Sequence, residues 1–514
     1  MPQQHLIPDA LRRADKLFGA KTAVIDGDVQ YTYRELTERC RRLAGALTQL
    51  GINKGDRVAV LMANGHRYLE CLFAVPGMGA VVVPLNNRLA VPEHQYILED
   101  AGVQVLIVDD RYAALGDELS GSVKEVVVAP DAYEQLLGTA PELTLAGEHG
   151  AQVEVAEDDL AGLFYTGGTT GAAKGVMLSH RNLMSNALHT ALGMSFSDQD
   201  VYLHCAPMFH LADGSCTYSV TWVGGTHAFV PMFDPALVLE TIARERVTHT
   251  VMVPTMLTAV NAHPDATTTD LSSLRKMLHG AAPIAADVLR RSIEIFGCSF
   301  TQGYGMTEAA PIVTLLPDEE NLVDDARLRS AGREVAGVEL TVRRPDGSLC
   351  DPGEVGEVVV RGPNIMSGYW NKPEATDAAL RDGWYWSQDL GYLDDECFLF
   401  LVDRAKDMII SGGENVYSIE VENAVMSHSA VLECAVIGVP DDHWGERVHA
   451  AVVVKPGQTL EANELLAHCK ELIAGFKSPR SVEFLDELPK SGAGKILKRD
   501  VRDRHWDGHD RAIH

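Results

Sequence analysis

A segment rich in glycine and threonine, with one lysine, is the sharpest chemical feature of this 514-residue chain. Residues 165–175 read YTGGTTGAAKG. Glycines let backbone N–H groups approach phosphate oxygens, threonine hydroxyls add donors or help hold a metal, and a lysine supplies positive charge. It is not a Walker loop, because no glycine directly precedes the lysine and no serine or threonine follows it. The segment predicts a nucleotide phosphate site, made of Thr166, Gly167, Gly168, Thr169, Thr170, Gly171 and Lys174.

Alternating strands and helices are predicted to position this segment. The apolar runs at 57–62, 80–84 and 105–109 read as strands, and residues 66–73 and 96–101 read as helices. This rhythm is typical of βαβ units with a parallel sheet buried on both faces. Residues 130–150 lack periodicity, so we expect a surface excursion there. The rhythm returns at 201–311.

The pattern of apolar and turn residues changes after residue 311 and predicts further structural units. Short strands at 338–343, 356–362 and 397–402, with turn signals between them, indicate an antiparallel sheet or small barrel. Residues beyond 403 show their own βαββαβ-like order. Its expected elements are helices at 418–426 and 461–473 and strands at 431–439, 449–454 and near 482. The fold class is therefore α/β, with parallel α/β subdomains and a distorted β-barrel in a large N-terminal domain, and a small α+β C-terminal domain.

The net charge of −28 argues against nucleic acid as a partner, since phosphate backbones attract basic surfaces. No apolar run has the length of a membrane span, and the first ten residues do not read as a signal peptide, so we expect a cytoplasmic protein. The nine cysteines form no Cys-x-x-Cys pair and no zinc spacing, which favours reduced, mostly buried thiols. A homodimer is left open.

Several blocks in order, over residues 28–499, resemble the adenylate-forming superfamily, which includes acyl-CoA synthetases, aryl-CoA ligases, adenylation domains and firefly luciferase. The 165–175 segment is similar to its phosphate loop, with Gly167 where a serine is usual and Ala173 where a proline is usual. The resemblance implies that the chain activates a carboxylic acid as an acyl-adenylate, using ATP and Mg²⁺, and transfers the acyl group to coenzyme A.

A second block, residues 302–308 (QGYGMTE), is similar to the superfamily's adenine and magnesium motif. The resemblance implies that Tyr304 stacks on adenine, Thr307 contacts the α-phosphate, and Glu308 helps hold Mg²⁺ together with Thr170. A carboxylate suits a hard cation. The remaining nucleotide contacts implied here are Gly280, Ala281, Ala282, Pro283, Gln302, Gly303 and Gly305.

A third block, from Gly383 to Glu422, supplies the implied ribose and hinge residues. Asp389 would accept hydrogen bonds from the ribose hydroxyls, and Arg404 resembles the second ribose contact. Gln388 stands where the superfamily usually has glycine, and it would crowd or reshape the ribose edge. Lys406 matches the position about which the small domain swivels, which implies domains at 1–403 and 407–514 joined by a hinge at 404–406.

The last block, residues 488–496 (LPKSGAGKI), places Lys495 at the position of the superfamily's catalytic lysine. Its ammonium would offset the repulsion between the substrate carboxylate and the α-phosphate. After rotation of the small domain, the turn formed by Ser411, Gly412, Gly413 and Glu414 would line a tunnel for the pantetheine arm of CoA. Local positive charge for anionic cofactors is expected from Lys470, Lys477, Arg480, Lys490, Lys495, Lys498, Arg499, Arg502 and Arg504.

The acyl pocket is the least determined part of the sequence. The resemblance implies a histidine gate or floor at His210, catalytic in that sense, and a lining that includes Asp213, Gly214, Gly280 and Met306. Asp213 would meet a polar group of the substrate or bond to backbone. The small lining residues favour a medium-to-long fatty acid, with an aryl acid of hydroxycinnamate or benzoate type as the alternative. Loading of a carrier protein, light-emitting oxygenation and non-catalytic nucleotide binding are the other readings.

Overall fold

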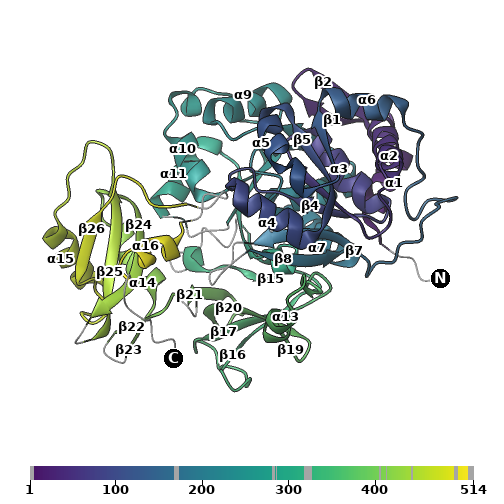
Figure 1. Cartoon of the computed structure of the whole chain (residues 1–514). Helices are drawn as coiled ribbons and strands as arrows, with labels where there is room; N and C mark the ends of the chain where they lie inside the picture. Colours follow the sequence, from purple (N-terminus) through teal and green to yellow (C-terminus); the bar gives the residue numbers. More distant parts are fainter. Residues whose placement is uncertain are drawn as a thin grey trace.

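The computed structural model describes residues 5–166, 173–280, 284, 286–317, 327–404, 407–411, 414–441, 444–490 and 496–506. Figure 1 shows a large body of sheets and helices, with the C-terminal sheet, drawn in yellow-green, to one side of it. The residues that the sequence analysis placed at 167–171, 281–283, 406, 412–413 and 495 lie outside this described part of the chain.

The sheet that bears the phosphate segment has the order β18-β8-β7-β4-β3-β5-β6. Strands β3 to β6 run parallel, as predicted, and β8 closes an antiparallel hairpin with β7 at one side. Strand β4 is buried along its whole length, which explains its unbroken apolar run. The bounds are β3 (Arg57–Leu61), β4 (Val81–Pro84), β5 (Val103–Asp109), β6 (Glu125–Ala129), β7 (Leu160–Thr166), β8 (Lys174–Ser179) and β18 (Gly368–Tyr369).

A second sheet has the order β15-β14-β13-β12-β11-β9-β10-β1-β2. Its central strands, from β13 to β1, are parallel, and β14 turns back antiparallel to β13. The predicted rhythm over residues 201–311 is therefore confirmed. The bounds are β1 (Thr22–Asp26), β2 (Val29–Thr32), β9 (Val201–His204), β10 (Thr226–Phe229), β11 (His249–Met252), β12 (Lys276–Gly280), β13 (Ser299–Gly305), β14 (Ile312–Leu316) and β15 (Arg333–Glu334).

Helices cover these two sheets (Figure 1). Two predicted helices are longer than expected: one starts at Val91, where Pro92 and the capping Glu93 begin it, and the other continues through Pro76. The bounds are α1 (Ile7–Phe18), α2 (Tyr33–Gln49), α3 (His66–Gly77), α4 (Val91–Ala101), α5 (Ala113–Leu119), α6 (Asp131–Thr139), α7 (His180–Met194), α8 (Leu211–Val223), α9 (Pro235–Glu245), α10 (Pro254–Asn261) and α11 (Ala286–Phe296).

The expected surface excursion at residues 130–150 is wrong in its first half, because α6 lies there. Tyr133 and Leu137, one turn apart, are buried, and the Tyr133 hydroxyl donates a 2.6 Å hydrogen bond to Glu70 Oε2. A nine-residue helix with one such pair offers too few repeats for its period to be recognised.

A small antiparallel sheet follows, with the order β16-β17-β20-β19 and β21 paired to β20. Its antiparallel registers confirm the antiparallel sheet predicted after residue 311. The bounds are β16 (Glu339–Arg343), β17 (Gly356–Arg361), β19 (Leu380–Arg381), β20 (Trp384–Leu393), β21 (Leu399–Arg404) and the helix α13 (Pro373–Ala379).

The C-terminal domain is a separate α+β unit with its own core. Val421 and Leu465 from its helices pack with Val436 and Val452 from its sheet. Its sheet has the order β23-β22-β25-β24, with β26 parallel to β25. The bounds are β22 (Ile409–Ser411), β23 (Glu414–Val416), α14 (Ser418–Met426), β24 (Val431–Asp441), β25 (Gly445–Val454), α15 (Ala462–Leu472), β26 (Ser481–Phe484) and α16 (Lys498–Asp503).

The nine cysteines are free thiols and six of them are buried, as the sequence predicted. Within the described residues, every helix is too short or too polar to traverse a lipid bilayer.

Candidate active site

The phosphate segment is framed by an antiparallel hairpin. Thr166 at the end of β7 is the register partner of Lys174 at the start of β8. Two side chains hold the base of this hairpin: the Tyr165 hydroxyl donates to Asp100 Oδ2 at 2.7 Å, and the Tyr96 hydroxyl donates to the Ala173 carbonyl at 3.1 Å. The hairpin therefore places Thr166 and Lys174 side by side at one edge of the sheet.

Lys174 and Glu308 meet through a tyrosine that the sequence analysis missed. The Lys174 Nζ lies 4.9 Å from the ring centroid of Tyr369, whose hydroxyl donates a 2.9 Å hydrogen bond to Glu308 Oε1. Tyr369 stands on β18, which pairs with β8, and Met366 N donates to the Glu308 carbonyl at 2.8 Å. No periodic signal in the sequence marks this contact, because β18 has only two residues.

Glu308 is half-buried, and desolvation raises the pKa of its carboxyl above the ordinary value, although the Tyr369 hydroxyl and the charge of Arg404 act in the opposite direction. A cation beside the carboxylate would favour its ionised form. A carboxylate oxygen aimed at a phosphate-binding edge fits a hard divalent cation.

Tyr304, Asp389 and Arg404 form the second half of the site. Asp389 and Arg404 are register partners on β20 and β21, which explains why two residues fifteen positions apart act together. The Tyr304 hydroxyl donates to Asp389 Oδ2 at 2.8 Å, and Arg404 Nε lies 3.1 Å from Oδ1. A carboxylate has about four lone-pair positions, so an Asp389 held in this way can still accept bonds from ribose hydroxyls.

Two of the expected nucleotide glycines are required by packing. A Cβ at Gly280 would lie 2.1 Å from the Gly303 carbonyl oxygen, and one at Gly305 would lie 1.9 Å from the Pro311 carbonyl oxygen. Gly280 lets the end of β12 lie close to β13, and Gly305 lets the end of β13 lie close to Pro311, just before β14. Gln302 is the register partner of His279 on β12 and is half-buried beside the same edge.

Three of the expected acyl-pocket residues, His210, Asp213 and Gly214, lie at the start of α8, whereas Gly280 ends β12 and Met306 follows β13. His210 precedes the helix, and its carbonyl accepts hydrogen bonds from Asp213 N at 3.1 Å and Gly214 N at 2.7 Å. A Cβ at Gly214 would lie 2.4 Å from the Met208 carbonyl oxygen, so only glycine fits there. Met306 is half-buried and packs against the core of both large sheets, next to Thr307 in a short 3₁₀ turn.

Asp213 faces the sheet. Its side chain is fully buried, and its Oδ1 accepts a 2.8 Å hydrogen bond from the Tyr202 hydroxyl, with His204 Nδ1 at 3.2 Å. Both expected partners, a substrate group and the backbone, are therefore replaced in the described residues by side chains of β9. An acidic residue on the first turn of a helix gives no sign in sequence of which side it faces.

Gln388 occupies a left-handed backbone conformation, with φ of 61°, and its side chain is exposed. Its backbone N–H donates to Glu357 Oε1 at 2.9 Å. The side chain therefore does not crowd Asp389. The superfamily's usual glycine at this position is explained by the left-handed backbone conformation, which glycine adopts without strain, and not by a lack of room for a side chain.

This conformation can be tested by stability. Gln388→Val is expected to lower the free energy of unfolding by about 1–2 kcal/mol, because a β-branched residue tolerates the left-handed region poorly. Gln388→Gly should match or exceed the wild type, since relief of strain offsets the extra entropy of glycine in the unfolded chain. Urea titrations of both variants measure this, and equal stabilities for the valine and glycine variants would contradict the assignment.

Described residues lie on either side of the segment expected to line the CoA tunnel and of the segment expected to carry the catalytic lysine. Ser411 and Glu414 are register partners on β22 and β23, on either side of residues 412–413. Lys490 and Ile496 form an antiparallel bridge on either side of residues 491–495. Both segments therefore begin and end at closely spaced points of the C-terminal domain.

The expected reservoir of positive charge is smaller than predicted. Lys498 is half-buried and its ammonium lies 2.8 Å from Glu422 Oε1, and Lys477 is paired with Glu420 at 2.8 Å. Lys490 is paired with Glu433 at 2.6 Å, and Arg502 with Asp407 at 2.5 Å. Arg499 lies 3.5 Å from Asp500 Oδ1, so at least five of the nine basic residues are paired with carboxylates of their own domain, a pairing that a count of charges does not reveal.

Comparison with known proteins shows the family of the chain. The AMP-binding enzyme family model matches residues 11–370, and the model of the AMP-binding enzyme C-terminal domain matches residues 420–495. A feruloyl-CoA synthase from Amycolatopsis is 45% identical over 484 residues, which are 94% of this chain and 96% of that protein. A long-chain-fatty-acid–CoA ligase from Thermus thermophilus is 38% identical over 527 residues, covering 97% of this chain and 95% of that protein.

Among solved structures, an o-succinylbenzoate-CoA synthetase from Bacillus subtilis, in complex with its acyl-adenylate intermediate, superposes with a TM-score of 0.86. It is 33% identical, and the match covers 98% of each chain. Family models and full-length relatives thus agree on the family over almost the whole chain. The chain belongs to the AMP-binding enzyme family, within the adenylate-forming superfamily, and is an AMP-forming acyl- or aryl-CoA ligase that uses ATP and CoA.

Proposed function

We propose that this ligase activates an aryl carboxylic acid of the hydroxycinnamate type, rather than a long-chain fatty acid. The observation that carries this assignment is the 45% identity to a feruloyl-CoA synthase over almost the whole of both chains, against 38% for the long-chain ligase. This reverses the order in which the small pocket residues had ranked the two acids.

The interior beside α8 also favours a short, flat acid. A continuous hydrogen-bonded row links α8 to the sheet: Asp213 contacts His204, His204 Nε2 lies 3.0 Å from His227 Nδ1, and His227 Nε2 lies 2.9 Å from Thr221 Oγ1. These side chains are fully buried. An alkyl chain that entered this layer would break hydrogen bonds at about 1–3 kcal/mol for each buried group left unpaired. An aromatic acid bound outside this buried layer of side chains would leave these hydrogen bonds intact.

The proposed reaction has two steps at one site. The acid's carboxylate attacks the α-phosphorus of ATP, giving acyl-AMP and pyrophosphate. The thiol of CoA then attacks the acyl carbon, giving the thioester, AMP and a proton. Asp389 and Arg404 hold the ribose, Tyr304 stacks on adenine, and the hairpin tip with Lys174 binds the phosphates. Lys495 places an ammonium between the two anions that must meet.

Magnesium fits the carboxylate of Glu308, with Thr170 as a further oxygen ligand. When bound it would neutralise negative charge on the phosphates. The chain's own contribution is to orient Glu308 through the Tyr369 hydroxyl and to keep Lys174 nearby.

We further propose that the domains divide at residues 404–406, with the large domain at 1–403 and the small one at 407–514. The self-contained core of the small domain supports a rigid-body rotation between the two steps. In one orientation Lys495 completes the adenylation site, and in the other the segment from Ser411 to Glu414 lines the CoA path.

The substrate assignment is tested by AMP release with CoA present and ferulate, cinnamate, benzoate, octanoate or palmitate as the acid. We expect kcat/KM for ferulate to exceed that for palmitate by about 10²-fold or more, because the buried row excludes a long chain. A preference for palmitate would overturn the aryl assignment and favour the fatty acid. A parallel series with a phosphopantetheinylated carrier protein in place of CoA tests the alternative acceptor, and faster transfer to that protein would reject CoA.

A further inference from the structure

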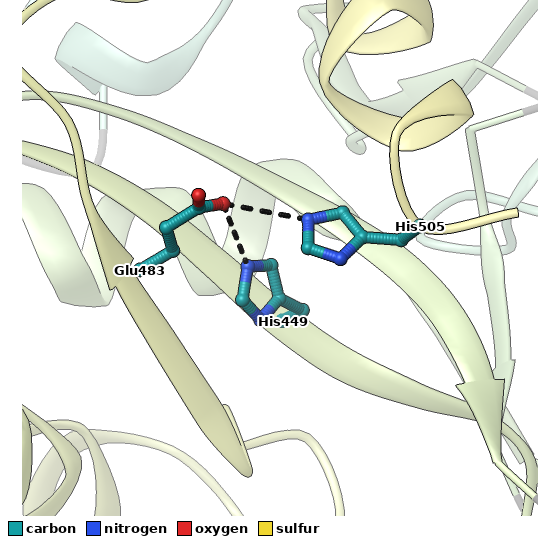
Figure 2. A group of neighbouring side chains, drawn as sticks. All are labelled: His449, Glu483 and His505. Atoms are coloured by element: carbon teal, nitrogen blue, oxygen red, sulfur yellow. Dashed lines mark ion pairs between the residues drawn. The ribbon is translucent and has the colours of Figure 1, made fainter. Parts of the chain in front are cut away.

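Two histidines and a glutamate converge in the C-terminal domain, away from the nucleotide residues. His449 lies on β25, Glu483 on the neighbouring strand β26, and His505 in the turn that follows α16 (Figure 2). The Glu483 Oε2 lies 3.4 Å from His505 Nε2 and 3.8 Å from His449 Nε2. One ligand atom from each side chain lies within 4.8 Å of the other two.

The two imidazoles are arranged to present Nε2. The Nδ1 of His449 is 2.8 Å from Ser481 Oγ, which fixes the ring and leaves Nε2 toward Glu483. Neither His449 Nε2 nor His505 Nε2 has a hydrogen-bond partner among the described residues, although both atoms are buried. Buried polar atoms without partners are rare, so a ligand that satisfies both nitrogens at once would remove a real cost.

We propose that His449, Glu483 and His505 form a binding site for a divalent transition-metal ion, with zinc as the best match. Two imidazole nitrogens and one carboxylate are a common zinc ligand set, with the fourth position open to water. Zinc bonds of about 2.0–2.2 Å place tetrahedral ligand atoms about 3.4 Å apart. The Glu483–His505 separation already has this value, and the His449 side needs only a small side-chain rotation. Nitrogen ligands disfavour magnesium and calcium.

The hydrogen bond on the other ring nitrogen of His449 favours the same outcome, because it orients the imidazole with Nε2 toward Glu483. A second oriented partner, such as Ser481, is typical of metal-binding histidines.

The bound ion would join three separate pieces of the chain. β25 and β26 are neighbouring strands, whereas His505 reaches them only after α16. The Trp506 indole already donates to the Gly438 carbonyl at 2.9 Å and holds this turn on the sheet. Metal binding would fasten the end of the described chain more firmly and stabilise the C-terminal domain.

The test uses the full chain, purified without a polyhistidine tag and stripped with a chelator. Zinc titrated by calorimetry should bind with a stoichiometry of one and raise the midpoint of thermal unfolding. Cobalt in the same site should give the intense visible absorption of a four- or five-coordinate ion. His505→Ala and Glu483→Gln should each weaken zinc binding at least about 10-fold. His505 is partly exposed, so its replacement should leave the domain folded, which circular dichroism checks.

His468→Ala is the matched control. His468 and His428 are also close together, with ring centroids 5.0 Å apart and Glu464 nearby, but the Nε2 of His468 is engaged at 2.8 Å by Ser427 Oγ. This variant should keep the wild-type stoichiometry, cobalt spectrum and thermal shift. Zinc binding that survives His505→Ala and Glu483→Gln unchanged, or a wild type that binds no zinc, would overturn the proposal.

Discussion

Replacing Lys495 with alanine is expected to lower the rate of acyl-adenylate formation by about 10²- to 10³-fold, while thioester formation from a supplied acyl-adenylate continues near the normal rate. The ammonium is required only where the carboxylate and the α-phosphate must approach each other. It has no such task once the acyl-adenylate exists. Exchange of labelled pyrophosphate into ATP measures the first step, and thioester formation from synthetic acyl-adenylate and CoA measures the second.

Lys490→Ala is a control on the same segment. Its ammonium is paired with Glu433 at 2.6 Å, and a partly exposed pair of this kind contributes little to stability. Both half-reactions should stay within about threefold of wild type, since an exposed ion pair is worth roughly 0–1 kcal/mol. If Lys495→Ala slowed both steps equally, or left pyrophosphate exchange normal, the assigned role would be wrong.

Glu308→Gln is expected to reduce adenylation by about 10²-fold and to raise the magnesium concentration needed for half-maximal activity. The substitution keeps the size of the side chain and an oxygen that accepts the hydrogen bond from Tyr369. It removes only the negative charge, so the effect isolates the carboxylate's attraction for the cation. Pyrophosphate exchange measured across a magnesium series reports both quantities.

Tyr369→Phe separates orientation from charge. It removes the 2.9 Å hydrogen bond to Glu308 but keeps the ring beside Lys174. A loss of about 10-fold is expected, because a hydrogen bond to a carboxylate is worth about 1.5 kcal/mol and about 1.4 kcal/mol corresponds to a factor of ten. An unchanged magnesium dependence in Glu308→Gln would refute the metal assignment, and a larger loss in Tyr369→Phe than in Glu308→Gln would make orientation the dominant effect.

The order of elements was largely predictable because its signals are local. The helix expected at 418–426 has those bounds, and the parallel strands were evident from unbroken apolar runs. Helix α6 was missed because its apolar period repeats only once. Long-range packing decides such short elements, and a window of sequence does not contain it.

The site shows the same division. Asp389 and Arg404 were expected to act on one ribose, and the structure makes them cross-strand partners. Tyr369 was missed because it reaches Glu308 from a short strand 61 positions away. The side that Asp213 faces, and the pairing of Lys498 with Glu422, depend equally on distant neighbours.

The cross-strand pair of Asp389 and Arg404 has a mechanical consequence. Arg404 is the last residue of β21, so the residue that pairs with one oxygen of Asp389 also lies at the boundary that we propose between the two domains. A nucleotide whose ribose hydroxyls attract Asp389 would therefore also displace Arg404, at the start of the proposed hinge. Nucleotide binding and the orientation of the small domain would then be coupled through the guanidinium of Arg404, with no chain of intermediate residues.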